Sequence, residues 1–81
     1  MITIQWDDLP PDLRDHLFER AAERKIKYDD IVKLAAWRRT SPRAPEGPWF
    51  KDFGSFRLAG NGAHPKTFLL AGQVAYGEEI N

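Results

Sequence analysis

Two histidines are the side chains of this sequence best suited to proton transfer at neutral pH. Asp12, His16 and Arg20 follow one another at intervals of four residues, which would place them on one face of a helix. His64 precedes a proline, with Lys66 close by. The sequence places no second catalytic group beside either imidazole, and a metal site needs three or four converging ligands. We therefore expect no catalytic site, no metal site and no cofactor, and we predict that the protein is not an enzyme.

Four acidic residues between positions 12 and 23 form a second pattern, with spacings of three and four residues. At 100° per residue these four side chains fall within an arc of about 80° on a helix. Like charges four residues apart, as in Asp15–Glu19 and Glu19–Glu23, repel each other by a few tenths of a kcal/mol. A basic partner protein would relieve that repulsion, and Trp37 would anchor the rim of the contact. We call these four residues the acidic ridge: Asp12, Asp15, Glu19 and Glu23.

A basic segment provides the alternative function. The chain has no net charge, but residues 21–51 carry eight bases and four acids. Arginines and lysines in this segment would bind phosphates while a tryptophan stacks on a base, although a neutral total argues against extensive coating of nucleic acid. The alternative is therefore a small nucleic-acid-binding protein that uses the end of the second helix and the following loop. Its candidate residues are Lys33, Arg38, Arg39 and Arg43.

Two predicted helices position both charged patterns. The first runs over about residues 10–25, because Pro10 and Pro11 suit a first helical turn and apolar residues recur on one side. The second runs over about residues 28–39, and Trp37 lies opposite its apolar stripe, where it covers a second layer or is exposed. The residues predicted to face the core are Leu13, Leu17, Phe18 and Ala21 in the first helix and Tyr28, Ile31, Val32, Leu34 and Ala35 in the second.

A proline-rich connector over residues 40–48 leads to an aromatic β segment. Alternating apolar residues predict strands near residues 55–58 and 67–70, joined by a loop of about six or seven residues. A third strand is expected at residues 74–76, and an edge strand at residues 2–6. The fold class is thus α+β, with a two-helix hairpin packed on a small two- or three-stranded antiparallel sheet.

The 81 residues fit one domain, with the helical hairpin at about 10–39 and the β segment at about 49–80. The absence of cysteine favours a cytoplasmic location, and no apolar stretch is long enough to span a membrane. We predict a non-enzymatic binding or regulatory module that recognises a partner protein through the acidic ridge. A homodimer is compatible with the sequence.

Overall fold

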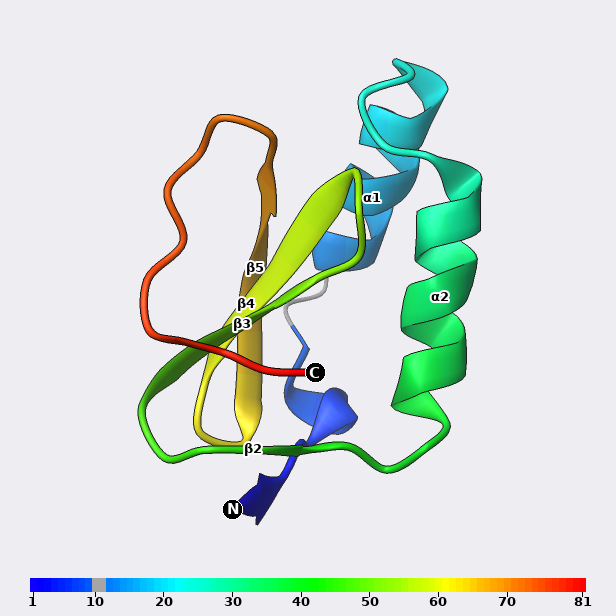
Figure 1. The fold of residues 1–81 in the computed structure, drawn as a ribbon. Coiled ribbons are helices and arrows are strands. Elements are labelled where there is room, and N and C mark those ends of the chain that lie inside the picture. The colour runs from blue at the N-terminus through cyan, green and yellow to red at the C-terminus, as the bar shows by residue number, and fades with distance from the viewer. Residues whose placement is uncertain (10–11) are drawn as a thin grey trace.

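The chain folds into two helices beside a twisted β-sheet. The computed structural model describes residues 1–9 and 12–81. Figure 1 shows both helices on one side of the sheet, so the fold is α+β, as predicted. In chain order the elements are β1 (Ile2–Thr3), the 3-10 helix η1 (Trp6–Asp8), α1 (Leu13–Ala22), α2 (Tyr28–Arg38), β2 (Arg43–Ala44), β3 (Pro48–Asp52), β4 (Phe56–Asn61), β5 (His64–Leu70) and β6 (Glu78–Glu79).

The sheet is larger than the sequence predicts. It has four strands in the order β5-β4-β3-β6, and β1 and β2 form a separate two-stranded pair. Strands β3, β4 and β5 are antiparallel neighbours, whereas β6 runs parallel to β3. The predicted packing of helices on an antiparallel sheet is therefore confirmed in part, because the fourth strand is parallel.

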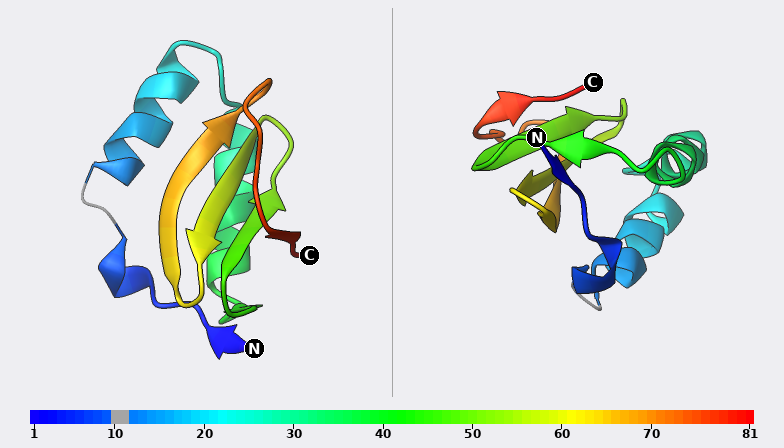
Figure 2. Two further views of the ribbon diagram at one scale, coloured as in Figure 1. Left: turned by 90° about the vertical axis from the view of Figure 1, so that its left-hand side faces the viewer. Right: turned by 90° about the horizontal axis from the view of Figure 1, so that it is seen from below.

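The segment that follows β5 corrects the predicted third strand. Residues 74–76 are not in a strand, and Val74 and Tyr76 are exposed. In Figure 2 this segment crosses the face of the sheet that points away from the helices and then reaches the far edge. There Glu78 and Glu79 pair with β3, and Ile80 enters the core.

The turn between β4 and β5 is tighter than predicted. The expected loop of six or seven residues is wrong, because Asn61 pairs with His64 and only Gly62 and Ala63 lie between the strands. Gly62 has a φ of 57°, which a glycine adopts without steric penalty. The hairpin was predicted, but its loop was predicted too long, because glycine, asparagine and proline are typical of loops and here take part in the pairing between β4 and β5.

The helices match the predicted positions but are shorter. The predicted start of the first helix at Pro10 and Pro11 lies outside the described residues, and α1 ends at Ala22, before the expected Lys25. The two helices spread apart with distance from the turn that joins them (Figures 1 and 2). Because the helices spread apart, the predicted hairpin is open at one end, and each helix packs mainly on the sheet.

The core lies between the helices and the sheet, and Trp49 is at its centre. Trp49 is fully buried, and its indole N–H donates a 2.9 Å hydrogen bond to the carbonyl of Gly62. Gly60 lies directly against this ring, where a Cβ atom would be 2.5 Å from it. The buried apolar residues are Ile4, Leu13, Leu17, Ala21, Ile26, Ala44, Trp49, Phe53, Phe56, Leu58 and Ile80.

The orientation of α2 corrects the predicted buried stripe. Tyr28 and Val32 are 56% and 65% exposed, and Ala35 is exposed as well. Phe18 of α1, which was also predicted to be buried, is 42% exposed. The residues of α2 that pack inward are Asp30, Ile31, Leu34 and Trp37. The helix is therefore rotated, and part of its apolar surface faces solvent.

We predict that Gly60→Ala destabilises the fold by about 2–3 kcal/mol, because the added methyl group would press on Trp49 and on the carbonyl of His64. Urea denaturation measures the loss. Ala59→Ser, at the neighbouring half-buried position, is the control and should change stability by less than about 0.5 kcal/mol. Equal stability of Gly60→Ala and the wild type would contradict the close packing.

Candidate protein-binding surface

A buried carboxylate sets the rotation of α2. Asp30 is only 4% exposed, and its Oδ2 accepts a 2.8 Å hydrogen bond from the backbone N–H of Ser55, in the turn between β3 and β4. In return, the Ser55 hydroxyl accepts a 2.9 Å hydrogen bond from the N–H of Lys27, just before α2. Lys33 Nζ lies 3.1 Å from Asp30 Oδ1. These contacts attach the first turn of α2 to the sheet.

The same contacts stabilise the charged form of Asp30. The Ser55 side chain, the Ser55 N–H and Lys33 outweigh the cost of burial and lower the pKa of Asp30 from 3.8 to about 2. The positive end of the α2 dipole also favours an acid in the first turn. Because its hydrogen-bonding capacity is used within the fold, we assign Asp30 a structural role.

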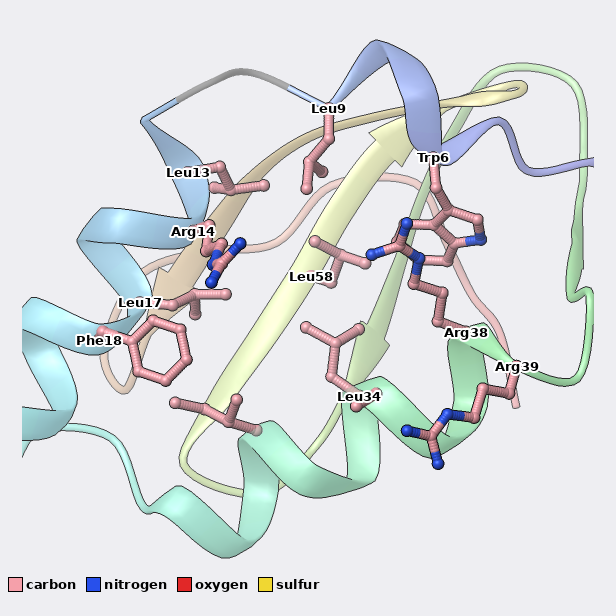
Figure 3. A pocket seen from close by; sticks show the side chains of 12 residues that line it. Trp6, Leu9, Leu13, Arg14, Leu17, Phe18, Leu34, Arg38, Arg39 and Leu58 are labelled. Atoms are coloured by element: carbon pink, nitrogen blue, oxygen red, sulfur yellow. The ribbon is translucent and has the colours of Figure 1, made fainter.

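The rotation leaves an apolar groove between the helices. Its volume is about 450 Å³. Figure 3 shows side chains from α1 on one wall and from α2 on the other, with Leu58 of β4 between them. Leu17 and Leu34 contribute to the apolar lining. The exposed Phe18 ring lies on the α1 wall, and its centroid is 6.3 Å from that of Tyr28.

Arginines border this groove on both walls. Arg14 extends from α1, and Arg38 and Arg39 extend from the end of α2 (Figure 3). All three are exposed, and none forms an ion pair with another described residue. The guanidinium of Arg38 lies 5.5 Å from the centre of the Trp6 ring, a cation–π distance. The groove therefore combines an apolar lining with unneutralised positive charge.

The acidic ridge lies on the outer side of α1, opposite the buried leucines by helical geometry. All four of its carboxylates are exposed, but two have basic neighbours. Asp12 is 3.9 Å from His16, and Glu23 is 2.7 Å from Arg20 and 3.5 Å from Lys25. Asp15 and Glu19 have no ion-pair partner within the described part of the chain. The middle of the ridge therefore carries its uncompensated charge.

The structure does not bring Trp37 to the acidic ridge. Its half-buried ring packs edge-on against Trp6, Trp49 and Phe53, at centroid distances of 5.8, 6.4 and 5.8 Å. Lys51 Nζ lies 5.3 Å from the centre of the ring. Trp37 therefore belongs to an aromatic cluster that covers the core on the β3 side of α2.

The basic residues of the alternative site do not form one surface either. Lys33 is paired with Asp30, whereas Arg38 and Arg39 border the groove. Arg43 is exposed on β2, in the two-stranded sheet. The structure thus combines only two of the four predicted residues at one place and adds Arg14 to them.

The groove was not predicted from the sequence, although the sequence contains a signal for it. The apolar residues of α2 cover roughly 260° of the helix at 100° per residue. A helix that packs on one sheet usually needs an apolar stripe of little more than 100°. So wide an apolar surface indicates that one side stays outside the core, but it does not identify the side.

Other site chemistry is sparse in the described residues. No three or more His, Asp or Glu side chains among residues 1–9 and 12–81 are grouped so as to hold a metal ion. His64 is an exposed residue at the start of β5. None of the described helices has the length and apolar character needed to cross a membrane.

Comparisons with known proteins give no family for this chain. No family model matches the sequence, and no curated protein or solved structure is similar to it at a significant level.

We predict that Asp30→Asn lowers stability by about 1–2 kcal/mol at neutral pH, because the amide cannot replace the carboxylate in all its contacts. The pKa of Asp30 in the folded protein, about 2, lies below its ordinary value of 3.8. The charged carboxylate therefore makes its full contribution to the stability of the fold above pH 3.8, and this contribution is lost as the pH falls through 2.

Urea denaturation at a series of pH values measures this effect. The stability difference between the wild type and Asp30→Asn should narrow between about pH 4 and pH 2. Asp29→Asn, at the exposed neighbouring position, is the matched control and should keep a steady difference from the wild type. A constant gap for Asp30→Asn would show that the carboxylate is not stabilised in its charged form.

Proposed function

We propose that the protein is a non-enzymatic module that binds another protein through the outer surface of its two helices. The observation that carries this proposal is the exposure of apolar residues on α2 beside the groove. Tyr28 and Val32 are more than half exposed, and Phe18 adds a ring from α1. Contiguous apolar surface of this kind is typical of protein interaction sites.

The position of the exposed apolar residues supports this choice of surface. Among residues 1–9 and 12–81, the large hydrophobic residues that are exposed are Met1, Phe18, Tyr28, Val32, Val74 and Tyr76. Three of them gather on the helices, whereas Val74 and Tyr76 lie in the segment that crosses the other face of the sheet. The helices also carry the groove, so shape and apolar character coincide there.

The acidic ridge adds a charged border to the same surface. Asp15 and Glu19 lie on α1 next to the residues that form the groove wall, Arg14 and Phe18. Their negative charge would attract basic residues of the partner and help to orient it. The proposal thus assigns the acidic ridge a role in orientation and the apolar groove a role in affinity.

Nucleic-acid binding is the second candidate, favoured by Arg38 and Arg39, which are exposed and have no ion-pair partner within the described part of the chain. The residues between the groove walls are mainly leucines, and the Trp6 ring nearby is covered by Arg38, so the groove offers little surface for stacking a base. A mobility shift with mixed RNA or DNA at low salt, lost in Arg38→Ala with Arg39→Ala, would favour this function over protein binding.

We predict that reversing the charge of the ridge in Asp15→Lys with Glu19→Lys weakens binding to the protein partner by about tenfold or more, which corresponds to about 1.4 kcal/mol. The partner is captured on the tagged protein, identified and purified, and its affinity is measured by titration calorimetry. The reason for the loss is repulsion between the new lysines and basic residues of the partner.

A matched double reversal on the far edge of the sheet is the control. Glu78→Lys with Glu79→Lys makes the same change in net charge at two exposed positions of β6 and should leave the affinity unchanged. An equal loss in both double variants would mean that only the net charge matters, and the helix surface would not be the contact.

A further inference from the structure

The groove has a chemical character that identifies its partner more closely. Its lining is apolar, and its three arginines have no carboxylate partner among the described residues. The carboxylates that do form ion pairs are Asp12, Glu23 and Asp30, and each of them pairs away from the groove. A ligand for this site should therefore be apolar and carry negative charge.

The arginines are placed to meet such a ligand from both sides. Arg14 is in the first turn of α1, and Arg38 and Arg39 are at the end of α2. Because the chain reverses between the helices, both of these ends lie at the open end of the hairpin, one on each side of the groove (Figure 1). Exposed guanidinium groups bind carboxylates through paired hydrogen bonds, so acidic side chains of a ligand would be held at this end.

The apolar part of the surface has the dimensions of a helix contact. Ile31, Leu34 and Arg38 line the groove at intervals of three and four residues, and this wall extends about 10 Å along α2 at 1.5 Å per residue. Phe18 lines the groove from α1. A groove between two helices that is lined in this way is a usual site for the apolar face of a third helix.

We propose that the groove between α1 and α2 binds an amphipathic helix of a partner protein, with the apolar side of that helix on Phe18, Leu34 and Ala35 and its acidic residues on Arg14, Arg38 and Arg39. This inference rests on the proposed protein-binding function and names the chemistry of the partner. Across the surface of α1 the charge changes from the positive groove to the negative acidic ridge. The partner therefore places acidic residues at the groove and basic residues towards the ridge.

The test uses a synthetic amphipathic helix of about five turns, roughly 18 residues, with leucines on one side and glutamates beside them. Fluorescence anisotropy of the labelled peptide measures its binding to the full-length protein. We expect saturable binding, weakened about tenfold or more by Ala35→Asp and by Arg38→Glu, because each disrupts one component of the contact. A second peptide with lysines in place of the glutamates should bind at least about tenfold more weakly.

Matched variants elsewhere on the molecule are the controls. Ala36→Asp makes the same change at the next exposed residue of α2, which lies outside the groove lining, and Arg43→Glu reverses an exposed arginine on β2. Both should bind the acidic peptide like the wild type. Because Ala35 and Arg38 are exposed, their replacement should leave the circular dichroism spectrum and the melting temperature near those of the wild type.

Four outcomes would overturn the proposal. They are no saturable binding of the acidic peptide, equal binding of the lysine peptide, equal losses in the control variants, and a groove occupied by a second copy or by nucleic acid. Sedimentation of the protein alone and competition with mixed RNA detect the last of these. If the acidic peptide fails while partner binding still depends on Asp15 and Glu19, the protein-binding function stands and only this inference is wrong.

Discussion

The contact between Asp30 and Ser55 is the constraint on which the outer surface of the protein depends. It joins the first turn of α2 to the turn between β3 and β4, and a buried carboxylate is tolerated there because two kinds of hydrogen bond and Lys33 compensate its burial. Ser55 also accepts a hydrogen bond from the Lys27 N–H, one of the groups that a helix leaves unsatisfied at its start. The turn between β3 and β4 thus caps the start of α2.

This attachment determines which apolar residues of α2 reach the core. With Asp30 facing the sheet, Leu34 and Trp37 lie on the same side of the helix and pack inward. Tyr28 and Val32 are then turned towards solvent. The groove is consequently a result of how the helix is anchored, and the leucines that line it also belong to the core or pack against it.

The charged surfaces follow from helix periodicity together with this rotation. The acidic ridge was recognisable in the sequence because residues three and four apart share a face of any helix. The grouping of Arg14 with Arg38 and Arg39 was not recognisable, because it depends on two helices that run in opposite directions and spread apart. Local periodicity assigns a residue to a face of its own helix, but it does not determine what that face meets.

The β segment shows the same difference between what local spacing predicts and what tertiary contacts determine. Alternation of apolar residues correctly indicated strands around Phe56 and Phe68, since a half-buried strand shows that pattern by itself. The short turn at Gly62 and the parallel strand β6 were missed, because pairing with a distant partner overrides the loop preference of the residues near them.

The sequence by itself determined the α+β class, the two helices, the central strands and the acidic ridge, all of which depend on spacing within one segment. Only the tertiary structure decided the rotation of α2, the exposure of Val32 and the position of three arginines around one groove. The physical reason is that a buried carboxylate must find its hydrogen-bond partners wherever the chain provides them. Asp30 accepts its hydrogen bond from Ser55, 25 residues away in the chain, and a local sequence pattern does not predict a contact over that separation.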